Sequence, residues 1–250
     1  MLDTTHILYM LISGGIGAAI VVALRLLNRE TYYRIAITAC AAVTIALHYS
    51  PLWVEYLTEG TATLSAEMLF LLYPCHICMW LLVLSAVFIK KEGVLARLLR
   101  DFTFLGGTIC GAIGTILNEN YDRTPDLTEY SVLKGLLSHS TMVLGCILLF
   151  VAGYAKIRMD RTIPSTLAGL ALFSANGLFV NWLFARCGLP SENAMFLEGS
   201  PYPDVPWLNA YAIFGAALLT GFLIALLYEQ FAFQKEERWY TRLGTRLRKK

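Results

Sequence analysis

Long apolar segments alternate with short polar connectors along most of the 250-residue chain. A helix of about 20 apolar residues crosses the hydrocarbon core of a bilayer, and most of these segments reach that length. The connectors carry turn residues or clustered charges, which the bilayer interior excludes. The pattern predicts seven spanning helices: Ile7–Leu27, Ile35–Trp53, Ala66–Phe88, Phe102–Leu117, Val132–Tyr154, Ile163–Phe184 and Leu208–Tyr228.

The composition agrees with this pattern. Hydrophobic residues make up 57% of the chain and charged residues 15%, which is too apolar for a soluble domain of this size. We therefore predict an all-α, multi-pass membrane protein, with one transmembrane domain over residues 1–233 and a basic tail over 234–250. The net charge of +2 gives no indication of nucleic-acid binding. No cofactor or metal is expected, and the sequence leaves the oligomeric state open.

The distribution of basic residues predicts the orientation. With seven passes, 17 of the 20 Lys and Arg residues fall on one side of the membrane. The exceptions are Arg123, Lys134 and Arg186. Because basic connectors stay in the cytosol, the N-terminus is expected outside and the C-terminus inside.

A run of reactive side chains interrupts the third apolar segment, at Tyr73–Cys78. Pro74 deprives a helix of one backbone hydrogen bond, so a kink or a local break is expected there. Cys75 and Cys78 are three residues apart and would share one helical face, whereas His76 would face elsewhere.

Other polar groups fall at a similar depth. At 1.5 Å per residue, Cys75, His139 and His48 lie about 10–13 Å below the outer ends of their predicted helices. Asn176 falls in the middle or outer half of its helix by the same reasoning. Polar groups at this depth are costly, so a layer of them from four helices predicts an interior cavity in the outer half of the membrane.

Cys75 and His139 form the candidate catalytic pair. A thiol acts as a nucleophile when it is deprotonated, and an imidazole within reach can accept its proton. An acyl-thioester on Cys75 could then pass from one lipid to another, with His48 and Asn176 orienting the base or the ester. Simpler interpretations remain, in which the histidines only hydrogen-bond neighbouring helices and Cys40, Cys110 and Cys146 are packing residues.

Several short motifs resemble the YwaF-type bacterial membrane proteins and are similar to the eukaryotic transmembrane protein 164, an acyltransferase. The likeness covers most of the chain, from about Leu69 to the last helix. The motifs are Pro74-Cys75-His76, Gly106-Gly107, Thr124-Pro125-Asp126-Leu127, Leu137-Ser138-His139 and Asn193-Ala194-Met195-Phe196-Leu197 with a later Pro201.

The resemblance implies a seven-helix fold in a bacterial cytoplasmic membrane, with Cys75 and His139 as the catalytic pair. It implies acyl exchange between phospholipids, notably onto a lysophospholipid. Bacterial members more often read Pro-Leu-His-Leu-Cys, which would align their cysteine with Cys78, so either thiol is a candidate nucleophile. Asn181 competes with Asn193 for the role of the asparagine motif. Residues expected to bind or orient the substrate are His48, His76, Cys78, Asn176 and Asn181.

Three other functions fit the same residues. Cys75-His-Ile-Cys78 has the C-x-x-C spacing of thiol–disulfide oxidoreductases, but a relay needs a second pair and only Cys187 lies in an outer loop. Cys75, Cys78, His48 and His139 are suitable ligand types for a metal. A transporter or sensor without covalent chemistry would also have a polar layer at mid-membrane.

Overall fold

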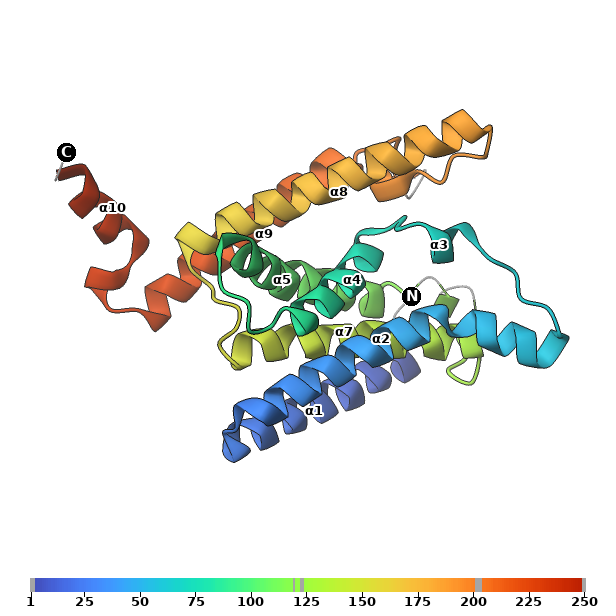
Figure 1. Ribbon diagram of the computed structural model, residues 1–250, viewed down its shortest axis with the longest axis horizontal. Helices are drawn as coiled ribbons and strands as arrows, with labels where there is room; N and C mark the ends of the chain where they lie inside the picture. The colour runs from blue at the N-terminus through green and yellow to red at the C-terminus, as the bar shows by residue number, and fades with distance from the viewer. Residues whose placement is uncertain (1–2, 119, 122–123, 201–203, 249–250) are drawn as a thin grey trace.

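The computed structural model describes residues 3–118, 120–121, 124–200 and 204–248. Every regular element in these ranges is a helix (Figure 1). The elements are α1 (Thr4–Leu27), α2 (Glu30–Glu59), α3 (Ala66–Leu69), α4 (Pro74–Val87), α5 (Val94–Ile116), α7 (Tyr130–Val151), α8 (Met159–Cys187), η1 (Ala194–Phe196), α9 (Ala210–Ala232), η2 (Lys235–Glu237) and α10 (Trp239–Arg248).

Six segments of the described chain are long and apolar enough to cross a membrane: α1, α2, α3 with α4 (Ala66–Val87), α7, α8 and α9. The prediction of an all-helical, multi-pass membrane protein is therefore confirmed. The long helices run along the long axis of the molecule, and connectors gather at its two ends (Figure 1). The loops after α1, α4 and α7 and the C-terminal segment lie toward the same end.

The remaining predicted span corresponds to α5, which is not among these six segments. It begins at Val94 rather than Phe102, and its first turns carry Arg97, Arg100 and Asp101. The helix lies at the centre of the bundle, packed against α4, α7 and α8. Since neighbouring helices shield it from lipid, its surface does not need to be uniformly apolar.

Glycines allow α5 to approach α7 closely. A Cβ atom added at Gly111 would lie 2.6 Å from Val143 Cγ2, and one at Gly107 or Gly114 would overlap Cys146 Sγ or the His139 ring. Small residues at this spacing permit the close helix packing that stabilises membrane bundles. This row of glycines on α5 (Gly107, Gly111 and Gly114) therefore sets how close the His139 ring lies to α5.

The second helix is longer than the predicted Ile35–Trp53, because a side chain compensates for a proline within it. Pro51 has no N–H for the carbonyl of Leu47, and the Ser50 hydroxyl donates a 2.6 Å hydrogen bond to that oxygen. A freed carbonyl satisfied in this way lets a membrane helix continue through a proline. The helix accordingly runs to Glu59.

Buried charges join the helices at the end where the α4–α5 and α7–α8 connectors lie. The Arg161 Nε and Nη2 groups donate to the two Asp101 oxygens at 2.7 and 2.9 Å, and the Lys156 amide donates to Oδ1 at 2.9 Å. Arg100 Nη1 donates to three carbonyls at the end of α4, among them Lys91 O at 2.8 Å. These bonds connect α5 to α4 and to the start of α8.

We expect Arg161→Met to destabilise the fold, because Asp101, whose side chain is 3% exposed, would lose its countercharge. Breaking a buried pair on one side costs about 3–5 kcal/mol. Thermal unfolding in detergent should show a clearly lowered midpoint. Arg158→Met is the control, since its partner Asp160 is 48% exposed and such pairs contribute roughly 1 kcal/mol or less. Equal effects of the two substitutions would contradict a structural role for the Asp101 pair.

Candidate active site at a broken helix

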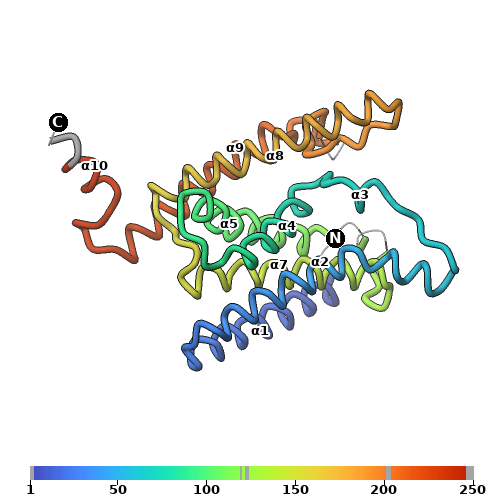
Figure 2. Tube along the Cα trace, in the orientation of Figure 1, coloured from blue at the N-terminus to red at the C-terminus, as the bar shows by residue number. Residues whose placement is uncertain are grey.

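The predicted third span is broken directly before the Pro-Cys-His sequence. α3 ends at Leu69, residues 70–73 are not helical, and α4 begins at Pro74. Figure 2 shows this part of the chain as an extended stretch. Tyr73 is extended, at φ −113° and ψ 154°, as expected for a residue before proline. The predicted break is therefore confirmed, and Pro74 occupies the first helical position, where its missing N–H costs little.

Carbonyl groups in the break receive hydrogen bonds from distant segments. The Asn176 Nδ2 group, on α8, donates to Leu71 O at 2.7 Å. The Met195 amide, in η1, donates to Leu72 O at 2.8 Å. A non-helical backbone at membrane depth needs such partners, because no water replaces them there. The two bonds therefore hold the break in place.

The η1 turn is itself fixed against α8. The Asn181 side chain accepts from the Ala194 amide at 2.8 Å and donates to the Ala194 carbonyl at 3.4 Å. Asn193, Met195 and Phe196 all have positive φ, at 47°, 56° and 59°, a strained region for residues other than glycine. This local strain persists because packing against α8 over-determines the turn.

These contacts give two asparagines structural partners. Asn176 and Asn181 were expected to bind or orient a substrate, but their Nδ2 groups are engaged with backbone carbonyls of the break and of η1. Sequence reasoning could not identify those partners, because they lie 105 and 13 residues away in the chain. Both side chains thus support the segment that carries Cys75.

Cys75 lies in the first turn of α4 and is partly buried. Pro74 has no N–H and the His76 amide donates to Tyr73 O at 3.0 Å, so in this turn the Cys75 amide remains available, at the positive end of the helix dipole. Together they stabilise negative charge on a thiolate or on a nearby oxyanion. Cys75 therefore occupies a position suited to a nucleophile.

Cys78 occupies a different environment, although it shares a helical face with Cys75 as predicted. Both thiols have Cys110 of α5 as a neighbour. Cys78 is fully buried, with Cys146 also close and Gly107 packed between the two. A lipid ester could not reach a thiol enclosed in this way without rearrangement of the core, so Cys75 is the more accessible of the two candidates.

Three histidines, from α2, α4 and α7, lie in one region of the bundle. The rings of His48 and His76 are 4.8 Å apart, centroid to centroid, and the Tyr73 ring is 5.2 Å from that of His76. His139 lies within electrostatic range of both rings, and so does Lys134. The structure thus brings together the three histidines that the depth argument and the motif singled out.

Each ring in this histidine cluster (His48, His76 and His139) has one buried nitrogen without a hydrogen-bond partner in the described part of the chain. His139 is the most informative, because its Nδ1 lies 2.9 Å from the Gly135 carbonyl, which can only accept. Nδ1 therefore carries the proton and Nε2 is the basic nitrogen. Its lone pair is buried and unengaged, as a general base requires.

The described residues form no hydrogen bond between the Cys75 thiol and the His139 ring. His76 is adjacent to Cys75 in sequence, and its Nδ1 is also unpartnered. The structure therefore offers two candidate bases: His139, whose tautomer is defined, and His76, which is adjacent to Cys75 in the chain. In the same ranges, no group of three or more His, Cys, Asp and Glu side chains is arranged to hold a metal ion.

A fourth histidine was not identified from the sequence. His6, which is 1% exposed, has its Nε2 group 2.8 Å from the Thr115 carbonyl at the end of α5. Asp3 is the N-cap of α1, the helix that carries His6, and it accepts a hydrogen bond from the Tyr121 hydroxyl at 2.7 Å. The His6 amide and that hydroxyl hold the pKa of the Asp3 carboxyl below its usual range. The available signal was the Asp3-x-x-His6 spacing at a helix start.

We expect Gly177→Ala to loosen the break. Its Cβ would lie 2.9 Å from the Ala194 carbonyl oxygen and 2.9 Å from Met195 Cβ, so η1 would have to move. Amide hydrogen exchange at Met195 should then increase, because its bond to Leu72 O weakens.

Gly215→Ala is the matched control for this substitution, since nothing lies within 4 Å of the added Cβ. It should leave exchange at Met195 unchanged. Slow exchange in the Gly177→Ala protein would show that η1 does not depend on close approach to α8.

Comparison with known proteins identifies a family. No curated protein and no solved structure matches the chain. The TMEM164 family model matches residues 1–228, which is nearly the whole described bundle and includes the broken helix and the three clustered histidines. The chain belongs to the TMEM164 family.

Proposed function

We propose that this protein is a membrane-embedded acyltransferase that moves fatty-acyl chains between phospholipids and lysophospholipids through a thioester on Cys75. The observation that carries the proposal is the position of Cys75 in the first turn of α4, directly after a helix break. Membership of the TMEM164 family supports it, because the resemblance to transmembrane protein 164 implies acyl exchange.

The proposed reaction has two halves. The Cys75 sulfur attacks the ester carbonyl of a donor phospholipid, and its proton moves to an imidazole. The tetrahedral oxyanion collapses, the ester C–O bond breaks, and the lysophospholipid leaves with that proton. The hydroxyl of an acceptor lysophospholipid then attacks the thioester carbonyl and gives its proton to the imidazole. The C–S bond breaks, the new phospholipid ester leaves, and the Cys75 thiolate takes the proton back from the imidazole. The Cys75 amide and the positive end of the α4 dipole are suited to stabilise both oxyanions.

His139 is the proposed general base. Its Nε2 is the unprotonated nitrogen, is buried, and has no partner among the described residues. The proton reaches it through a bridging water or through a small approach of α4 toward α7, since apo geometry in catalytic sites is often loose. His48 and His76 contribute to the surface on which the lipid ester is oriented.

The same proposal includes a seven-pass topology with α5 as the additional span. The connectors and tail at one end carry 17 of the 20 basic residues, which supports an outer N-terminus and a cytosolic C-terminus. The broken helix then opens toward the outer half of the membrane. We expect the protein in a bacterial cytoplasmic membrane.

One observation favours a second candidate, thiol–disulfide exchange. Cys78 has Cys75, Cys110 and Cys146 as neighbours, so two further thiols lie beside the C-x-x-C pair in space although not in sequence. Oxidation of Cys75 and Cys78 to a disulfide would require an acceptor of two electrons and two protons, such as a quinone. All six cysteines are free thiols in the structure.

We expect Cys75→Ala to abolish acyl transfer from a fluorescent phospholipid to a lysophospholipid in proteoliposomes. His139→Ala should lower the rate by about 10²–10⁴-fold, the usual contribution of a general base. His76→Ala should have a smaller effect if His139 is the base. The measurement is the initial rate at saturating lipid, with folding checked by size-exclusion chromatography.

Cys187→Ala provides the matched control, because this exposed thiol lies at the end of α8. It should retain the full rate. Transfer that survives Cys75→Ala would remove Cys75 as the nucleophile, and loss on Cys78→Ala alone would transfer that role to Cys78.

A further inference from the structure

The C-terminal helix α10 has a strongly amphipathic sequence. Its apolar positions include Trp239, Tyr240 and Leu243, and its basic positions include Arg242. At 100° per residue the three apolar residues lie within one third of the helix circumference, and Arg242 lies outside that sector. Such a helix is typical of segments that lie in the plane of a membrane surface.

Hydrogen bonds fix the start of α10 against the ends of two membrane spans. Glu229 of α9 is 1% exposed, and its Oε2 accepts from the Trp239 amide at 2.6 Å. Its Oε1 accepts from the Met159 amide at 2.8 Å and from Arg242 at 3.3 Å. Since α8 begins and α9 ends here, α10 is held at the boundary between membrane and water. Figure 1 shows it turning away from the direction of α9.

The bundle covers only part of the apolar face of α10. Trp239 packs beside the cluster of Ile157, Met159 and Ala225. Tyr240 and Leu243 are 40% and 47% exposed. An aromatic and an aliphatic side chain left uncovered at the interface suit insertion between lipid headgroups.

The positive charge of this segment favours lipids with anionic headgroups. From Arg238 to Lys250 the sequence has six basic residues and no acidic one. Arg242 is neutralised by Glu229 and Asp160. In the sequence Arg238 precedes it, and the other four basic residues follow it. A cationic segment beside a membrane span attracts anionic headgroups within about one Debye length.

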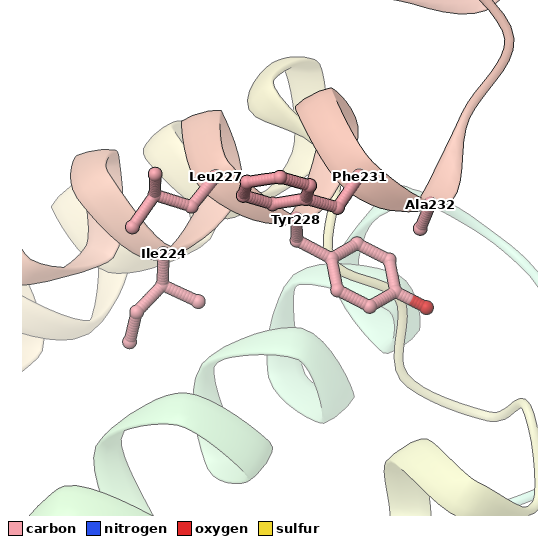
Figure 3. A pocket seen from close by; sticks show the side chains of 5 residues that line it. All are labelled: Ile224, Leu227, Tyr228, Phe231 and Ala232. Carbon is pink, nitrogen blue, oxygen red and sulfur yellow. The ribbon is translucent and has the colours of Figure 1, made fainter.

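An apolar groove runs along the same end of α9. It has a volume of about 460 Å³ and is lined by Ile224, Leu227, Tyr228, Phe231 and Ala232 (Figure 3). Its lining is almost entirely hydrocarbon and aromatic ring, which matches a lipid acyl chain. A headgroup at α10 and a chain in this groove could therefore belong to one lipid molecule.

We propose that α10 is an interfacial anchor that binds the headgroups of anionic phospholipids, with the groove on α9 receiving an acyl chain. This site lies at the end of the bundle opposite to the helix break and does not depend on acyl transfer.

The test is amide hydrogen exchange of the full-length protein in nanodiscs. One set contains phosphatidylcholine alone and the other an equimolar mixture with phosphatidylglycerol. Exchange over residues 239–248 should be about tenfold slower in the anionic discs, because several cations contribute. High salt should remove most of the difference. Equal exchange in both discs would overturn the proposal. Equal exchange is also the result expected if α10 binds an acidic protein partner instead of lipid.

Variants separate lipid binding from general charge. R246Q/R248Q/K249Q/K250Q should abolish the difference between the discs, and Leu243→Ser should reduce it. The matched control K90Q/K91Q/R97Q/K156Q removes four exposed cations from the same end of the molecule and should preserve the difference. Loss of the difference in this control would show that overall charge, rather than α10, is responsible. Unchanged exchange in α7 verifies that each variant is folded.

Discussion

Every backbone polar group inside a membrane must find a partner within the protein, and the helix break before Pro74 is the place where this constraint is hardest to meet. A continuous helix would satisfy residues 70–73 internally, but it would place Cys75 in mid-helix. The chain instead uses Asn176 and the Met195 amide to satisfy the exposed carbonyls. Much of the structure around the break follows from that requirement, including the strained η1 turn and Gly177 of α8, which packs against that turn.

The break also determines what Cys75 can do. A thiol in the first turn of a helix is exposed to the positive end of the helix dipole, whereas Cys78, one turn later, is enclosed by α5 and α7. The histidine cluster adds three ring nitrogens that have no hydrogen-bond partner among the described residues. Cys75 and His76 belong to α4, whereas His48 lies on α2 and His139 on α7. The bonds from α8 and η1 hold the break that precedes α4.

Local sequence signals were sufficient for part of this description. Hydrophobic length predicted the spanning helices, and Pro74 predicted the break, because both depend on properties of the segment itself. The start of α5 at Val94 was missed, since a helix shielded by its neighbours can carry Arg97, Arg100 and Asp101. The extension of α2 through Pro51 depends on one serine hydroxyl. The depth argument placed His48 and His139 at a similar height, and the two rings lie within electrostatic range of each other. Sequence reasoning could not show that Asn176 and Asn181 donate to backbone carbonyls.

Intact mass spectrometry of the protein purified with its lipids tests the central claim most directly. Wild type and Cys75→Ser would be measured before and after treatment with neutral hydroxylamine, which cleaves thioesters. The account predicts a fatty-acyl adduct on the wild type that hydroxylamine removes and that the variant lacks. An adduct that persists in Cys75→Ser would contradict it, and a wild-type mass two hydrogens below that of the free thiols would instead indicate a Cys75–Cys78 disulfide.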